Sequence, residues 1–163
     1  MITWNFNPYA IALLCTGFLS LTLSIQLFLR WANRECVLLG FAVLMIAEWS
    51  FFVGLESAVQ QNSIKVLFSQ FSYFGVFNCL PFVLLFVLYF FDFKTHIHPG
   101  KIFLLWVLPN IIFLLAATNN YHHLIWSEYV TPSDAPYNTL VYHRGPLYWL
   151  GVIYNYSICM VIS

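Results

Sequence analysis

Residues 71–91 read FSYFGVFNCLPFVLLFVLYFF and contain no charged side chain. A helix needs about 20 mostly apolar residues to cross a hydrocarbon core about 30 Å thick, because each residue adds about 1.5 Å. This segment therefore predicts a membrane-spanning helix. Four other segments have the same apolar character, at residues 9–29, 36–55, 102–118 and 147–163. The sequence predicts an all-α fold, a polytopic transmembrane helical bundle, and we expect it to be incomplete because its last apolar segment runs to the end of the chain.

The composition of the 163 residues excludes a soluble domain. Hydrophobic residues make up 61% of the chain and charged residues 7%, whereas an ordinary soluble domain carries roughly 25% charged residues. The six basic residues balance six acidic ones and form no cluster, which excludes a nucleic-acid partner because a phosphate-binding face needs clustered lysine and arginine. The four cysteines have no CxxC or metal-ligand spacing, so we expect neither a disulfide framework nor a metal site.

The basic residues also predict the orientation in the membrane. The connections after the first and third segments hold four of them, whereas the connections 56–70 and 119–146 hold two. The four are Arg30, Arg34, Lys94 and Lys101, and the two are Lys65 and Arg144. Because basic residues accumulate in cytoplasmic loops, we expect the N-terminus and residues 119–146 to lie outside.

One carboxylate lies well inside a predicted span. A charged Glu48 in the second helix would cost about 3 kcal/mol on insertion scales, so it should face the bundle interior, be paired or stay protonated. Counting residues from the middle of each helix places Asn78, Thr16 and Asn110 at a similar depth. We expect these four residues to form one buried hydrogen-bonded cluster, in or under a cavity that opens to the outside. The alternative is a structural polar clamp without a ligand.

Two prolines interrupt the third and fourth predicted helices. Pro81 and Pro109 lack a backbone donor, which frees the carbonyls of Phe77 and Leu105, four residues earlier. We expect a kink at each proline, and kinks open room between helices.

The connection 119–146 is long and aromatic, with Pro132, Pro136 and Gly145 as turn residues. Loops of this length are usually functional or disordered, so we expect it to fold back over the bundle as a lid. It also carries three histidines, at His122, His123 and His143. Glu128 and Asp134 lie in the same connection. Three histidines in an outer loop can bind a metal or report external pH. We rank both below a loop without such a site, and we predict no metal there.

Several stretches carry a family resemblance. In the first half they are Ala47-Glu48-Trp49-Ser50 through Gly54-Leu55-Glu56, Lys65 ahead of residues 68–75, and Pro81 in a phenylalanine-rich helix. In the second half they are Leu108-Pro109-Asn110, Thr118-Asn119-Asn120-Tyr121-His122-His123-Leu124-Ile125-Trp126, Arg144-Gly145-Pro146-Leu147-Tyr148-Trp149 and Tyr154-Asn155-Tyr156. Placed on the predicted spans, they resemble the N-terminal seven-transmembrane sensor region of prokaryotic sensor histidine kinases, a region also found ahead of diguanylate cyclases. The resemblance covers essentially the whole chain.

The resemblance implies that residues 1–163 form a partial membrane sensor domain with about five of seven helices. It implies a multi-pass protein of a prokaryotic plasma membrane that passes a signal to a cytoplasmic output domain in the same polypeptide. That output domain would lie outside these 163 residues. The partners would then be the lipid bilayer, an unknown small ligand or membrane signal, the output domain, and a second copy of the chain in a homodimer. The region itself would be no enzyme, with no catalytic residue and no cofactor.

The resemblance adds candidate sensing residues to the Glu48 layer. Its characteristic segment contains Asn119, His122, His123 and Trp126. Two other functions stay open. One is a transporter or channel component with a buried polar path around Glu48, although the sequence has no internal repeat. The other is a truncated, non-signalling gene product.

Overall fold

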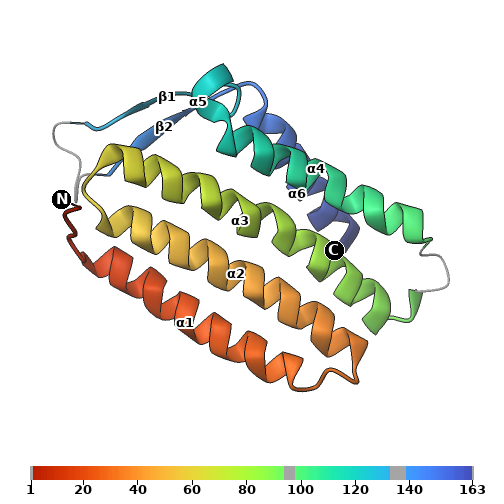
Figure 1. The fold of residues 1–163 in the computed structure, drawn as a ribbon. Helices are drawn as coiled ribbons and strands as arrows, with labels where there is room; N and C mark the ends of the chain where they lie inside the picture. The colour runs from red at the N-terminus through yellow and green to blue at the C-terminus, as the bar shows by residue number, and fades with distance from the viewer. Residues whose placement is uncertain (1, 94–97, 133–138, 163) are drawn as a thin grey trace.

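The computed structural model describes residues 2–93, 98–132 and 139–162 (Figure 1). Its helices are α1 (Pro8–Phe28), α2 (Arg34–Ala58), α3 (Asn62–Phe90), α4 (Pro99–Ala117), α5 (Asn119–His122) and α6 (Tyr148–Ile162). Within the described residues, α1 to α4 are long and apolar enough to cross a membrane, and α6 is a shorter apolar helix. The fold is therefore mostly all-α, as predicted, and is a membrane-type helical bundle.

The long helices form a row in chain order. Figure 1 shows α1, α2 and α3 lying side by side with alternating direction, while α4 and α6 cover the other side of α3. Two glycines allow close approach of neighbouring helices. A Cβ on Gly75 would lie 2.5 Å from the carbonyl oxygen of Met45 on α2, and one on Gly151 would lie 2.5 Å from the Phe77 ring. Small residues at such contacts are typical of helix packing in lipid, where van der Waals contact drives association.

The bundle has two ends that differ in structure. We call one the hairpin end, because a small β-hairpin lies there together with the N-terminal residues and the turn between α2 and α3 (Figure 1). The opposite end holds the turn between α1 and α2 and the C-terminal end of α3. Lys94 and His96, which belong to the predicted connection at that end, lie outside the described residues.

The start of α3 differs from the prediction. Residues 56–70 are predicted to form a connection, but α2 continues to Ala58 and α3 begins at Asn62. The polar residues of this stretch face inward, since Lys65, Ser69 and Gln70 are all buried. Residues 65 and 69 are one helical turn apart, which places them on one face of α3. The first turns of α3 carry polar residues on a buried face. A prediction from apolar runs alone therefore places the start of this helix too far along the chain.

The long connection 119–146 is not an irregular loop. It contains α5 and two antiparallel strands, β1 (Trp126–Val130) and β2 (Val141–Arg144), with Tyr129 opposite Tyr142 and a bulge between Trp126 and Glu128. The small sheet corrects the expectation of a purely helical chain with a long outer loop. Strand pairing across residues distant in sequence leaves little local signal. Residues 133–138, which include Asp134 and Pro136, lie outside the described residues.

Candidate functional site

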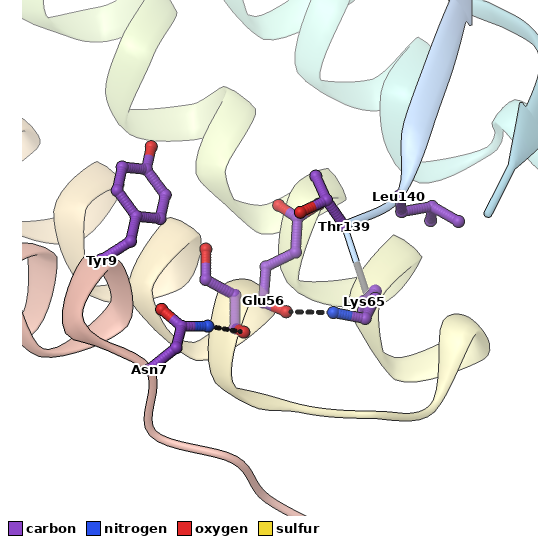
Figure 2. A pocket seen from close by; sticks show the side chains of 7 residues that line it. Asn7, Tyr9, Glu56, Lys65, Thr139 and Leu140 are labelled. Carbon is purple, nitrogen blue, oxygen red and sulfur yellow. Dashed lines mark hydrogen bonds between the residues drawn. The ribbon is translucent and has the colours of Figure 1, made fainter. Parts of the chain in front are cut away.

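A cavity of about 330 Å³ lies at the hairpin end (Figure 2). It forms where the N-terminal segment, the α2–α3 turn and the residues before β2 meet. Its lining consists of Asn7, Tyr9, Glu56, Ser57, Lys65, Thr139 and Leu140. We call this cavity the hairpin-end pocket. Polar and charged side chains line this space, which is large enough for a small molecule.

Asn7 closes the N-terminal side of the pocket. Its side-chain oxygen accepts a hydrogen bond from the backbone N–H of Ala10 at 2.8 Å, so it caps α1. Its side-chain nitrogen donates to the carbonyl of Ser57 at 2.9 Å, across to the last turn of α2 (Figure 2). The backbone N–H of Asn5 also donates to the carbonyl of Ala58 at 2.7 Å. These bonds fix the N-terminal segment against the C-terminal end of α2.

Lys65 is a charged side chain inside the protein. Only 2% of the residue is exposed, and its Nζ donates to the backbone carbonyl of Glu56 at 3.0 Å (Figure 2). That carbonyl belongs to the last turn of α2, where free carbonyls and the helix dipole favour a cation. An ammonium group carries three donors, and this contact uses one of them.

Glu56 connects α2 to the hairpin. Its Oε1 accepts a hydrogen bond from the hydroxyl of Tyr142 on β2 at 2.6 Å. Burial, together with the nearby Glu56 carboxylate, raises the pKa of Tyr142 above its usual range. The hydroxyl therefore stays protonated and acts as the donor. This hydrogen bond is a specific link between the hairpin and the helices.

Trp126 anchors β1 on the bundle. The residue is 2% exposed, and its indole Nε1 donates to the hydroxyl of Tyr73 on α3 at 2.9 Å. Its ring meets Tyr73 edge-on with centroids 5.1 Å apart and lies 5.0 Å from the Tyr142 ring. Trp126 was predicted as a sensing residue, but its contacts are those of the hydrophobic core beneath the hairpin.

Asn119 holds the start of the hairpin in place. Its side-chain oxygen accepts from the backbone N–H groups of Ile125 and Trp126, at 2.9 and 3.1 Å, and its nitrogen donates to the carbonyl of Trp126 at 2.9 Å. The residue is 1% exposed. One side chain thus bonds to three backbone groups where the chain enters β1. A ligand would have to displace these bonds to reach Asn119.

The two predicted histidines form the turn that follows α5. His122 accepts from the backbone N–H of Leu124 at Nδ1, 3.0 Å away, and its Nε2 lies 3.1 Å from the Thr118 hydroxyl. This arrangement assigns the hydrogen to Nε2. His123 is exposed and takes a left-handed conformation with φ of 55°, which ends α5. His143 lies 3.9 Å from Glu128 on the exposed hairpin. Among the residues that the structure describes, no three potential metal ligands meet at one point.

Gly145 explains part of the Arg144–Trp149 stretch. A Cβ at this position would lie 2.6 Å from the carbonyl carbon of Leu124, so only glycine fits against that backbone. The N–H of Gly145 donates to the Ile125 carbonyl at 2.8 Å, and the Arg144 guanidinium lies 4.0 Å from the centre of the Tyr148 ring. The stretch therefore fastens the end of β2 to the turn before β1.

The predicted polar cluster in the middle of the bundle is not formed. Thr16 is exposed and bonds to the carbonyl of Ala12 in its own helix. Asn78 and Asn110 likewise donate to carbonyls four residues earlier in their own helices, at 2.8 Å each. Similar depth does not fix the direction in which a side chain points around its helix, which is why the prediction failed. Whether any of these residues senses a ligand stays a prediction.

Glu48 lies against Gly75 of α3, and a Cβ at Gly75 would meet its carboxylate. Among the described residues, its Oε2 has no hydrogen-bond partner, and the same holds for Oδ1 of Asn155 on α6. A cavity of about 210 Å³ lies beside Gly75 and is lined by Asn155. The carboxylate is therefore inside the bundle, as expected, without the polar partners that were expected for it.

The two prolines lie inside continuous helices, Pro81 in α3 and Pro109 in α4. Pro109 frees the carbonyl of Leu105, and the hydroxyl of Tyr154 on α6 donates to this carbonyl at 2.5 Å. The carbonyl that the sequence identified as free thus forms a link between α4 and α6. The predicted kinks stay predictions.

The sequence analysis did not select the residues of the hairpin-end pocket as candidates. Glu56, Lys65 and Tyr142 lie at the ends of elements, where a charge or hydroxyl looks solvated. Charged residues make up 7% of the chain, and two of them, Glu56 and Lys65, lie on either side of the turn between α2 and α3. Two opposite charges so close together in such an apolar chain are the one sequence signal that points to this site. The contact with Tyr142 joins residues 86 positions apart, and no sequence pattern shows it.

The comparisons with known proteins give one match. A comparison with curated proteins finds no significant match, and neither does a comparison with solved structures. A family model of the N-terminal 7TM region of histidine kinases matches residues 12–163, which include all the described helices and strands apart from the first four residues of α1. The match covers most of the chain and agrees with its apolar helices. The chain therefore belongs to the family of N-terminal seven-transmembrane regions of histidine kinases.

Proposed function

We propose that this sensor region detects a small ligand at the hairpin-end pocket and passes the signal to a cytoplasmic output domain in the same polypeptide. The proposal places the protein in the plasma membrane of a prokaryote, with the N-terminus and the hairpin end outside. Family membership supports the sensor role, and the apolar helices support embedding in a bilayer. Such regions are input domains, so catalysis would belong to the output domain.

The observation that carries this proposal is the hydrogen bond between Tyr142 and Glu56. It joins the hairpin to the last turn of α2 directly beside the pocket. The hairpin would have two positions, one with this bond formed and one with it broken. A ligand that binds beside Glu56 and breaks or strengthens the bond would favour one of these two positions. Coupling of this kind requires different ligand affinity for the two arrangements.

The helices provide a route from the pocket to the opposite end. α2 and α3 run the length of the bundle and pack extensively against each other, and α3 contacts both α4 and α6. The bond from Tyr154 to the Leu105 carbonyl links α4 to α6. In the proposal, a shift of α3 reaches α6 through these contacts. Glu48 stays a second candidate for sensing, and a homodimer stays part of the proposal for the partners.

Replacing Tyr142 with phenylalanine tests this function. The change removes the hydroxyl and leaves the ring, so the hairpin keeps its apolar contacts. A hydrogen bond contributes about 0.5–1.5 kcal/mol, which corresponds to roughly a two- to tenfold shift between two arrangements. We expect the kinase or cyclase activity of the full-length protein, measured in membrane vesicles, to shift by about that factor and to respond less to its signal.

Tyr129 provides the matched control. It pairs with Tyr142 across the hairpin, with ring centroids 6.5 Å apart, and is 43% exposed, so Tyr129→Phe removes a more exposed hydroxyl and leaves the bond from Tyr142 to Glu56 in place. This variant should leave the output unchanged. Wild-type output and wild-type response in the Tyr142→Phe protein would contradict the proposed role of the pocket.

A further inference from the structure

We propose that the ligand of the hairpin-end pocket is a small monocarboxylate, whose carboxylate accepts hydrogen bonds from the remaining donors of Lys65. This inference rests on the proposed function only for the location of the site. It concerns the chemical class of the ligand, which binding measurements test independently of signalling.

The buried ammonium group is the main unsatisfied feature of the pocket. Lys65 is 2% exposed and makes one hydrogen bond, to the Glu56 backbone carbonyl. Within the described part of the chain, no carboxylate oxygen is shown within 4.0 Å of its Nζ. A buried charge is usually both paired and fully hydrogen-bonded, because desolvation penalises it otherwise. Among residues 2–93, 98–132 and 139–162, one acceptor contacts the Lys65 ammonium, which leaves two N–H donors available beside a cavity that this residue lines.

Several other polar groups of the pocket are already engaged. Oε1 of Glu56 accepts from Tyr142, and both polar atoms of the Asn7 side chain make hydrogen bonds to backbone groups. Lys65 lines the cavity and supplies a cationic donor. This favours a ligand with an anionic acceptor, whereas the ammonium group of an amine would be repelled by that of Lys65.

The charge of the pocket limits the ligand to a single negative charge. The Glu56 carboxylate does not contact the Lys65 ammonium directly but interacts with it electrostatically, so the two side chains together carry no net charge when both are ionised. A dianionic phosphate ester would leave excess negative charge next to the Glu56 carboxylate in a partly apolar site, where like charges repel strongly. A carboxylate brings one charge and forms charge-assisted hydrogen bonds with an ammonium group.

The size and the walls of the pocket suit a short molecule. A volume of about 330 Å³ is at the lower end of the range for small-molecule sites, which is roughly 300–1,000 Å³. Tyr9 and Leu140 supply apolar walls. A short aliphatic or a small aromatic acid fits this combination of one acid group and an apolar body.

The test compares four probes of similar size on the wild-type full-length protein in lipid nanodiscs. The probes are butyrate, 1-butanol, butylamine and the zwitterion 4-aminobutyrate, and binding is measured by calorimetry or saturation-transfer NMR. We expect butyrate to bind at least about tenfold more tightly than the other three, as a charge-assisted hydrogen bond predicts. Equal or tighter binding of butanol, butylamine or 4-aminobutyrate would overturn the inference, and so would the absence of butyrate binding.

Variants then locate the binding site. Lys65→Met keeps the length of the side chain and removes its charge, so butyrate binding should be lost, whereas Lys65→Arg should retain it. Lys101→Met is the matched control, because it removes a lysine exposed at the opposite end of the bundle. Leu140→Trp fills the cavity with Lys65 intact and should also abolish binding, which covers the case in which Lys65→Met does not fold. Retained binding in a folded Lys65→Met or Leu140→Trp protein would overturn the assignment.

The outcomes separate this inference from the proposed function. Butyrate binding that depends on Lys65 without any change in output would support the ligand class and count against sensing at this pocket. A changed output in Tyr142→Phe without butyrate binding would support sensing and overturn the ligand class.

Discussion

Replacing Trp126 with alanine is expected to destabilise the protein by about 3–5 kcal/mol and to release the hairpin from α3. The indole is buried, donates to the Tyr73 hydroxyl at 2.9 Å and packs between the rings of Tyr73 and Tyr142. Its removal leaves a cavity and also exposes the Tyr142 bond to Glu56. The measurements are thermal unfolding in detergent and limited proteolysis of the hairpin, which should become faster in the variant.

Trp149 supplies the control for this change. It is 55% exposed at the start of α6, so Trp149→Ala removes the same side chain from a surface position and should change stability little. Trp126→Phe keeps an aromatic ring and loses the bond to Tyr73, with an expected loss of about 1 kcal/mol. Equal stability of the Trp126→Ala and Trp149→Ala proteins would contradict the role of Trp126 as the anchor.

Replacing Asn119 with alanine is expected to cost roughly 3 kcal/mol or more, the second-largest effect. The change leaves the N–H groups of Ile125 and Trp126 and the carbonyl of Trp126 without their side-chain partner. Each buried polar group left unpaired costs about 1–3 kcal/mol. Thermal unfolding should show the loss, and hydrogen exchange at the Ile125 and Trp126 amides should become faster.

The adjacent asparagine gives a close control. Asn120 is exposed, so Asn120→Ala should leave both stability and amide exchange near wild-type values. Asn119→Asp keeps the acceptor for two N–H groups and loses the donor to the Trp126 carbonyl, so its effect should fall between the two alanine variants. Unchanged exchange at Ile125 and Trp126 in the Asn119→Ala protein would show that these bonds do not hold the turn.

Hydrophobicity predicted the helices because the bilayer imposes one requirement along their whole length. Lipid offers no hydrogen-bond partner to the backbone, so a single chain segment that crosses the bilayer forms a helix. A run of about 20 apolar residues is therefore enough to predict a spanning helix. The same criterion failed at residues 62–70, where α3 carries Lys65, Ser69 and Gln70 on a buried face. A polar residue there is satisfied by other parts of the protein, which composition does not show.

The site was less predictable because it depends on contacts between distant elements. Glu48 was correctly placed inside a helix, but Thr16 and Asn110 bond to their own helices and do not join it. The characteristic segment with Asn119 and Trp126 was recognised as distinctive, and the structure gives these two residues a structural role under the hairpin. The pocket itself needs the N-terminal segment, α2, α3 and β2 to meet, and only the fold brings them together.

The most direct test of the central claim is the accessibility of the two ends of the bundle in intact cells. Single cysteines are introduced at Ser127 on β1 and at Ala32 in the turn between α1 and α2, both exposed, in a background lacking the four native cysteines. A membrane-impermeant maleimide should label Ser127→Cys in intact cells and Ala32→Cys only after permeabilisation. Labelling of both cysteines in intact cells, or of Ala32→Cys alone, would contradict a membrane-spanning sensor with its hairpin end outside.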